Sequence, residues 1–298
     1  MSEAKQIKLG IVGYGEIGST WGAGLRKNGL SQVFSYDKYA FDGPYSALIQ
    51  KRATEAGVTL VKSNQELADN CDIILGATPG SSSLASAESF APVLNARHIF
   101  VDVASATPKI KRGVAERLQA TGARVGDASI MGTPRDGVGM PLITSGEPAE
   151  VLPESLNPWG MNFSAVGPVL GTASGIKIMR SVLIKGIEAL LFETILGSRQ
   201  YGVDDTVIQS AARTLSIPFM TTVDRMLSTG VIHAERRAEE MRMAAEALED
   251  AGVDPIMTRS TAERLQWIAD MQLKRHFSGV VPPSYKEAVD AVEEAAKS

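Results

Sequence analysis

Residues 10–18 read Gly10-Ile11-Val12-Gly13-Tyr14-Gly15-Glu16-Ile17-Gly18, an apolar run that breaks into the pattern G-x-G-x-x-G. The apolar residues predict a buried strand, and the residues from Glu16 onward predict a helix. A glycine turn between a strand and a helix leaves free backbone N–H groups and the positive end of the helix dipole where a pyrophosphate can bind. We therefore expect a dinucleotide site whose turn consists of Gly13, Gly15, Glu16, Ile17 and Gly18.

The next two strand-like runs add candidate cofactor contacts. Residues 33–36 end at Asp37, and an acidic side chain there accepts hydrogen bonds from a ribose diol and repels a 2′-phosphate. We therefore expect NAD as the cofactor in preference to NADP. Residues 72–76 lead into Ala77-Thr78-Pro79, where the chain leaves the carboxyl edge of the predicted sheet. Ligands of open α/β sheets bind along that edge.

The overall composition is that of an ordinary globular protein. The chain has 298 residues, 44% of them apolar, which is enough for one large or two moderate domains. A formal net charge of −4 argues against nucleic acid or an anionic membrane surface as a partner. The most apolar stretch, 182–196, is interrupted by charged residues and is not a clean membrane span. The three histidines are far apart in the sequence, so no metal is expected.

The single cysteine, Cys71, cannot form an internal disulfide. The first residues lack the apolar stretch of a signal peptide, so we expect a reducing, cytoplasmic setting. No neighbour in the sequence would activate the Cys71 thiol, which we expect to be inert packing.

Strand-like and helical segments alternate through the first half of the chain, which is typical of a parallel sheet with crossover helices. The predicted strands are 7–12, 32–36, 72–76, 98–102, 123–127 and 141–145. Beyond the glycine-rich stretch 167–175 the pattern is helical. We therefore expect an α/β protein: a Rossmann-like, doubly wound parallel sheet that binds NAD over 1–171, and an all-α substrate and dimerisation domain over 172–298.

Residues 176–196 are apolar nearly all round, which predicts a central, buried helix. At 100° per residue, one stripe roughly 140° wide contains most of its polar residues, namely Lys177, Arg180, Ser181, Lys185 and Glu188. Gly186 and Glu193 point the other way. The stripe has two interpretations: a site beside the domain boundary, or a lysine and an arginine that extend their charged ends into solvent.

Four segments, in order, resemble the β-hydroxyacid dehydrogenases, the superfamily of 3-hydroxyisobutyrate and 6-phosphogluconate dehydrogenases. They are the turn at 13–18; residues 102–108 (DVASATP), which resemble D-x-S-T-x-x-P; residues 127–133 (DASIMGT), which resemble D-A-P-V-S-G-G; and Gly171-x-x-x-Gly175-x-Lys177, which resembles the segment with the catalytic lysine. Residues 180–190 are more similar to a divergent branch with a C-terminal domain of unknown function.

The resemblance implies that Lys177 exchanges the substrate hydroxyl proton while hydride passes to the cofactor. A lysine with its ordinary pKa of about 10.4 is a poor base at neutral pH, so its amine would need partial desolvation or a neighbouring cation such as Arg180. Ser105 and Ser181 would orient the substrate oxygen. The substrate site would be lined by Met131, Gly132, Thr133 and Arg180.

This chain departs from the family at three of these positions. Met131 and Thr133 replace a serine and a glycine of the substrate segment, which puts carboxylate binding there in doubt. Ser181 replaces an asparagine and offers one donor where the amide offers two. These changes favour a larger, less polar or differently charged substrate, with Arg180 as the candidate partner of an anionic group.

Several functional alternatives stay open at this point. The leading hypothesis is an NAD-dependent oxidoreductase that oxidises a hydroxy compound, such as a substituted 3-hydroxy acid or a bulkier alcohol. The others are a redox-neutral lyase or isomerase that uses NAD transiently, and a dinucleotide-binding sensor without catalysis. We also expect a homodimer formed through the helical domain, with the site near the subunit boundary.

Two further features have a structural and a functional interpretation. Asp102 and Asp127 each close an apolar run, and we expect strand-end or turn residues there rather than acid catalysts. The glycines at 132, 137, 139 and 146 are typical either of a loop that closes over substrate or of a tight connection.

Overall fold

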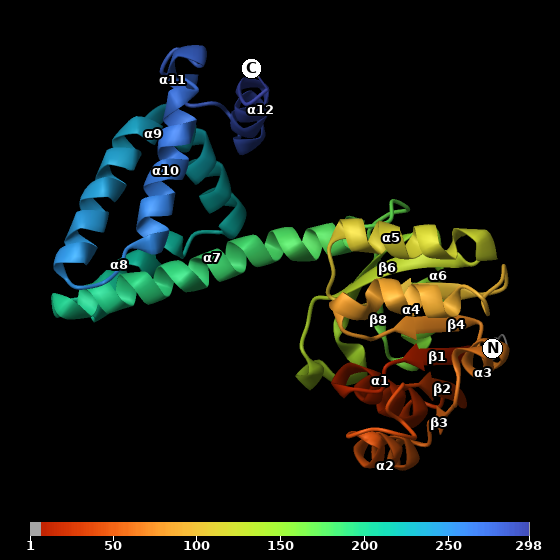
Figure 1. Ribbon diagram of the computed structural model, residues 1–298. Helices are drawn as coiled ribbons and strands as arrows, with labels where there is room; N and C mark the ends of the chain where they lie inside the picture. Colours follow the sequence, from red (N-terminus) through yellow and green to blue (C-terminus); the bar gives the residue numbers. More distant parts are fainter. Residues whose placement is uncertain (1–6, 298) are drawn as a thin grey trace. The chain divides into compact units, whose positions relative to one another are not determined.

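Strand β1 (Lys8–Val12) lies at the centre of the first half of the chain. It is buried from its second residue onward and pairs in parallel with β2 (Gln32–Tyr36) on one side and β4 (Ile73–Gly76) on the other. The computed structural model describes residues 7–297 and divides into two units, one ending at Ser181 and one beginning at Val182. Figure 1 shows the sheet in the first unit and helices alone in the second.

The sheet of the first unit has eight strands among the described residues, in the order β3-β2-β1-β4-β5-β6-β7-β8. The remaining strands are β3 (Thr59–Leu60), β5 (Ile99–Asp102), β6 (Arg124–Ile130), β7 (Pro141–Gly146) and β8 (Asn162–Ala165). All neighbours pair in parallel except β6 and β7, which are antiparallel. The predicted doubly wound α/β fold is confirmed, with one antiparallel pair in it.

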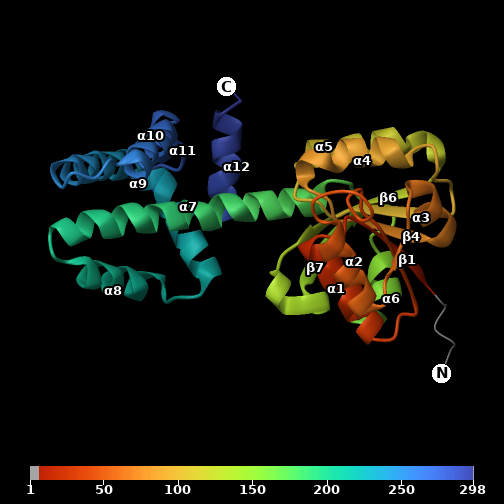
Figure 2. The same cartoon turned by 60° about the horizontal axis from the view of Figure 1, so that its bottom comes forward.

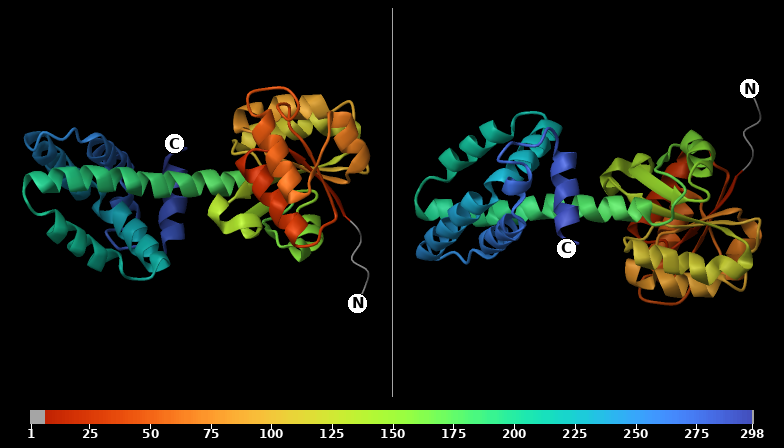
Figure 3. Two further views of the ribbon diagram at one scale, coloured as in Figure 1. Left: turned by 90° about the horizontal axis from the view of Figure 1, so that it is seen from below. Right: turned by 90° about the horizontal axis from the view of Figure 1, so that it is seen from above.

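Helices cover both faces of this sheet, as Figure 2 shows. One apolar core lies under α1 (Glu16–Lys27), α2 (Ser46–Ala56) and α6 (Val151–Leu156). The other lies under α3 (Asn64–Asn70), α4 (Ser83–Phe90) and α5 (Pro108–Leu118). The described residues of this unit also form four short 3₁₀ turns: η1 (Gly80–Ser82), η2 (Gln119–Thr121), η3 (Pro134–Gly139) and η4 (Asn157–Trp159). Figure 3 shows the sheet twisting between the two helical layers.

The register of the sheet aligns the residues that matter for the site. Val12 pairs with Gly76, Gly76 with Asp102, Asp102 with Asp127 and Asp127 with Ser145. Asp127 lies within β6, which continues to Ile130, so the expectation that Asp127 ends a strand was wrong. Antiparallel pairing with β7 keeps β6 extended beyond the point where β5 ends.

The second unit is helical throughout its described residues. After the C-terminal part of α7 (Thr172–Gln200) come α8 (Asp204–Leu215), α9 (Phe219–Asp250), α10 (Ile256–Asp270), α11 (Leu273–His276) and α12 (Tyr285–Ala295). Helices α10, α11 and α12 all pack against α9. In the described part of the chain, no helix combines the length and the apolar character that crossing a membrane requires.

The prediction that residues 176–196 form a buried helix was wrong for this chain. The segment is helical, but its apolar side chains are widely exposed, with Val182 at 66% and Phe192 at 65% of full accessibility. A helix that is apolar all round is expected to be buried against another surface, but the pattern does not show whether that surface belongs to the same chain.

Glu193 is buried, in contrast to the exposed apolar side chains of the same segment. Its carboxylate accepts hydrogen bonds from the backbone N–H groups of Met257 and Thr258, each at 2.9 Å, and from the Thr258 hydroxyl. These N–H groups belong to the first turn of α10, where no helical carbonyl can accept from them. The carboxylate therefore caps α10 and tethers it to α7.

We predict that Glu193→Ala destabilises the protein by about 1–3 kcal/mol, because buried N–H groups lose their acceptor. Glu193→Gln keeps one acceptor oxygen and should cost less. Urea unfolding followed by circular dichroism measures both, with Glu188→Ala, on an exposed side of the same helix, as the control. An unfolding midpoint equal to that of the parent for Glu193→Ala would contradict the capping role.

Candidate active site

The glycine turn after β1 has the geometry of a phosphate cradle. Gly13 has φ +90°, and a Cβ at Gly18 would lie 2.1 Å from the Gly13 carbonyl oxygen, so α1 can approach the turn only with glycine there. A Cβ at Gly15 would meet nothing within 4 Å, which leaves the turn open on that side. Gly15 is the N-cap of α1, and it has no side chain with which to cap the helix.

A cavity of about 560 Å³ lies against this turn. Six predicted cofactor residues line it: Gly13, Gly15, Asp37, Ala77, Thr78 and Pro79. The other three predicted residues, Glu16, Ile17 and Gly18, do not line it and contribute the start of α1 instead. The carboxyl ends of β1, β2 and β4 therefore converge on one crevice, as expected for a doubly wound sheet.

Asp37 is fixed at the rim of this cavity by two backbone groups. Its Oδ2 accepts from Tyr14 N at 2.8 Å, and its Oδ1 accepts from Tyr39 N at 2.9 Å. Each carboxylate oxygen retains a second lone pair for a ligand hydroxyl. Asn64, which the sequence analysis missed, lines the same cavity with a buried Oδ1 that accepts no hydrogen bond from the described residues. The residues present thus fit an adenosine dinucleotide.

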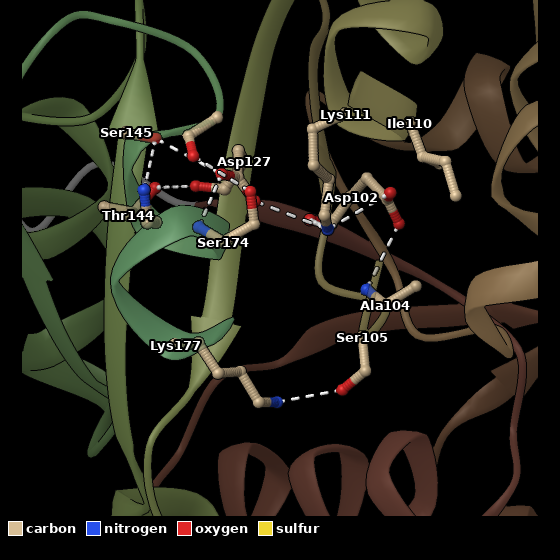
Figure 4. Close-up of polar contacts among 12 residues, drawn as sticks. Asp102, Ala104, Ser105, Ile110, Lys111, Asp127, Thr144, Ser145, Ser174 and Lys177 are labelled. Carbon is tan, nitrogen blue, oxygen red and sulfur yellow. Dashed lines mark hydrogen bonds and ion pairs between the residues drawn. The ribbon is translucent and has the colours of Figure 1, made fainter. Parts of the chain in front are cut away.

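Lys177 lies in the second turn of α7, and its ammonium donates a hydrogen bond of 2.9 Å to the Ser105 hydroxyl (Figure 4). Ser105 follows β5 and is exposed. A Cβ at Gly80 would lie 2.0 Å from the Ser105 carbonyl oxygen, so η1 packs its backbone directly on this residue. Because η1 follows the cavity residues Thr78 and Pro79, the Lys177–Ser105 pair is adjacent to the cofactor crevice.

The aspartates of the two family-like segments do not face this crevice as free acids. Asp102 and Asp127 are buried and flank the ammonium of buried Lys111, at 3.2 and 3.4 Å. Both carboxylates are therefore engaged with a buried cation. Nothing in the sequence distinguishes Lys111, because a lysine in an amphipathic helix is normally a solvent-facing residue.

The predicted residues Arg180, Ser181 and Thr133 differ in their exposure and in their hydrogen bonds. Arg180 is exposed and Ser181 half-buried, and among the described hydrogen bonds Lys177 joins Ser105 rather than Ser181. Thr133 donates from its backbone N–H and its hydroxyl to the Asp136 carboxylate, at 2.7 and 3.1 Å. Both of its donors are therefore bonded to Asp136 at the start of η3.

The loop after β6 is a tight connection. Met131 N donates to the Pro141 carbonyl at 2.8 Å, and a Cβ at Gly132 would lie 2.7 Å from Asp136 Oδ2. Val138 packs so closely on α1 that a Cβ at Gly24 would lie 2.4 Å from it. These contacts favour the tight connection over the loop that closes on substrate.

Cys71 is buried, and burial together with the neighbouring Asp72 raises the pKa of its thiol to about 12. At neutral pH the group stays a protonated thiol without nucleophilic character. The expectation of an inert packing residue is confirmed.

The match to protein-family models decides the identity of the first unit. Residues 8–152 match the NAD binding domain of 6-phosphogluconate dehydrogenase, and residues 199–268 match DUF1932, a domain of unknown function. Residues 8–152 therefore form an NAD-binding domain of the type found in 6-phosphogluconate dehydrogenase, which agrees with the resemblance to the β-hydroxyacid dehydrogenases. The second match confirms the predicted divergent branch with its own C-terminal domain.

Individual relatives agree with this assignment. A 127-residue segment, 42% of this chain and 36% of the relative, is 28% identical to mitochondrial 3-hydroxyisobutyrate dehydrogenase of Drosophila melanogaster. A conserved protein of unknown function, described as structurally similar to 3-hydroxyacid dehydrogenases, is 27% identical with a TM-score of 0.63, covering 90% of this chain and 99% of that one. An imine reductase from Aspergillus terreus, 18% identical with a TM-score of 0.72 over 96% and 99% of the chains, shares the fold.

We predict that Asp37→Ser raises the Kd for NAD about tenfold or more, because two ribose hydrogen bonds are lost, and that it narrows the preference for NAD over NADP. Isothermal titration of both dinucleotides measures the change. Asp42→Ser, in the exposed loop that follows, is the control. Tighter binding of NADP than of NAD by the parent protein would contradict the role assigned to the carboxylate.

Proposed function

We propose that the protein is an NAD-dependent oxidoreductase that oxidises a hydroxy compound, with Lys177 as the acid/base. The observation that carries the proposal is the Lys177–Ser105 hydrogen bond beside the cofactor crevice. It joins a proton-exchanging amine to a hydroxyl that can orient an alcohol oxygen. The match of the first unit to a dehydrogenase cofactor domain supports redox chemistry.

Ser105, Lys177 and Arg180 have separate roles in the proposed reaction. NAD, when bound, supplies a hydride acceptor. Ser105 orients the substrate hydroxyl, and Lys177, as the neutral amine, takes its proton; in the reverse direction the ammonium returns the proton to the nascent alkoxide. Arg180, exposed one turn after Lys177, would contact an anionic group of the substrate.

The substrate class follows from the chain's departures from the family pattern. Met131 replaces a hydroxyl residue and is half-buried, and Thr133 is occupied with Asp136. The segment therefore offers few polar groups to a small carboxylate. We favour a substituted 3-hydroxy acid or a bulkier alcohol for this reason.

We predict that Lys177→Ala lowers turnover by about 10²–10⁴-fold, the usual contribution of a general acid/base, and leaves the Kd for NAD unchanged. The measurement is NADH absorbance with a panel of 3-hydroxy acids and aryl alcohols. Lys109→Ala, an exposed lysine of α5, is the matched control.

The same assay separates the alternatives. Substrate consumption by the parent without NADH would indicate a redox-neutral lyase or isomerase. NAD binding with no turnover of any substrate in the panel would favour a sensor. Full activity of Lys177→Ala would refute the lysine mechanism.

We also propose a homodimer that forms through the helical unit. From Val182 onward, α7 leaves seven large apolar side chains exposed in the chain: Val182, Leu183, Ile184, Ile187, Leu191, Phe192 and Leu196. This many exposed large apolar side chains on one stretch of helix indicates an interaction site. Lys177 lies on the same helix, so the active site would lie near the subunit boundary.

We predict a mass in solution of twice 31.7 kDa by light scattering at micromolar concentration. Replacing Val182 and Phe192 together by Asp should give a monomer, because charge would then be buried at the interface. Thr194→Asp, exposed on the same helix, is the control. A monomeric parent would contradict the proposal.

A further inference from the structure

Three charged side chains are buried together behind the Lys177–Ser105 pair. Lys111 is 1% exposed, Asp102 3% and Asp127 0%. The Lys111 ammonium lies 3.2 Å from Asp102 Oδ2 and 3.4 Å from Asp127 Oδ1, and it donates to the Asp102 carbonyl at 2.6 Å. Apart from these ion pairs with Lys111, Asp102 Oδ2 and Asp127 Oδ1 accept no hydrogen bond from the described residues. One ammonium thus holds both carboxylates.

The other oxygen of each carboxylate accepts a hydrogen bond from the backbone close to Ser105 or Lys177. We call these two sets of contacts the Asp102 branch and the Asp127 branch. Asp102 Oδ1 accepts from Ala104 N at 3.2 Å, the residue directly before Ser105. Asp127 Oδ2 accepts from Ser174 N at 2.9 Å, three residues before Lys177 in the first turn of α7. Figure 4 shows the two branches on either side of Lys111 and, below them, the hydrogen bond between Lys177 and Ser105.

Further contacts fix the Asp127 branch on the sheet. The Ser145 hydroxyl of β7 donates to Asp127 Oδ2 at 3.4 Å and accepts from Ala173 N at 3.0 Å. Asp127 and Ser145 are register partners, so the first turn of α7 is bonded to two adjacent strands. The start of the helix cannot rotate without breaking these bonds.

A buried ionic cluster of this kind is not explained by stability alone. Taking three charges out of water costs free energy that their mutual attraction barely offsets, and well-packed apolar groups of the same size often stabilise as much. Its geometric effect is specific: it sets the separation between the loop after β5 and the first turn of α7.

We propose that Lys111 is a positioning residue of the active site: by bridging Asp102 and Asp127 it holds the Lys177 amine within hydrogen-bond distance of Ser105. The catalytic consequence rests on the proposed function of Lys177. The geometric consequence does not, so it can be tested without a known substrate.

The test measures the reactivity of the Lys177 amine toward acetic anhydride in the NAD-saturated protein, by mass spectrometry of the peptide that contains it. Ser105→Ala should raise the labelling rate about fivefold, the effect of losing one hydrogen bond. Lys111→Met should give a similar rise, and the double variant no further rise. Lys109 is exposed on α5, the helix that contains Lys111, so in Lys109→Met the Lys177 amine should be labelled at the parent rate.

Activity provides the second readout. With any substrate that the parent turns over, Lys111→Met should lower kcat at least tenfold with little change in the Kd for NAD, and should have no further effect in a Lys177→Ala background. Parent-like labelling and kcat in Lys111→Met would overturn the inference. A rise in labelling with unchanged kcat would instead support the positioning and refute the proposed function of Lys177.

A variant that fails to fold does not end the test. Asp102→Asn retains an acceptor for Ala104 N and removes the side-chain ion pair with Lys111, while the Lys111 bond to the Asp102 carbonyl stays. Circular dichroism and NAD binding report its fold. If it folds and Lys177 labels at the parent rate, the inference is wrong; a rise equal to that of Ser105→Ala supports it.

Discussion

One ammonium group, that of Lys111, lies between two carboxylates that the sheet register places side by side. A lysine buried to this extent must be ion-paired, and two buried aspartates must in turn have a cation. The bonds that satisfy these three groups also join β5, β6, α5 and the first turn of α7. The position of Lys177, one turn further along α7, depends on this join.

The cofactor crevice depends on close approaches of backbone to backbone. A side chain at Gly18 would collide with the Gly13 carbonyl, and one at Gly80 would collide with the Ser105 carbonyl. The contact at Gly18 brings the start of α1 to the glycine turn after β1. The contact at Gly80 brings the turn after β4 to Ser105, which is hydrogen-bonded to Lys177. Both occur at the carboxyl edge of a parallel sheet, where side chains from separate strands converge.

Features encoded in short, contiguous stretches were predictable from the sequence. The Gly13–Gly18 turn, Asp37 at the end of β2 and Thr78 after β4 all follow from the strand-turn-helix pattern. The polar stripe of α7 indicates Lys177 as a candidate, but only the family resemblance gives it a role and points to Ser105, because nothing local shows that residues 72 positions apart are hydrogen-bonded. The two-residue strand β3, together with β8 and α6, left no clear periodic signal.

Features that depend on tertiary context were not predictable. Lys111 occupies an ordinary place in an amphipathic helix, and only the register of β5 against β6 makes it a buried bridge. The apolar surface of α7 predicted burial, but periodicity carries no information on which chain supplies the cover. The hydrogen bonds from the two donors of Thr133 to the side chain of Asp136, three residues later, also had no signal in the sequence.

A crystal structure of the protein with NAD and an oxidisable 3-hydroxy acid tests the role of Lys177 most directly. We expect the nicotinamide end of the cofactor to lie beside Ser105, with the Lys177 nitrogen roughly 3 Å from the substrate hydroxyl. A complex in which that hydroxyl bonds to another group, while Lys177 faces bulk solvent away from the nicotinamide, would contradict the account.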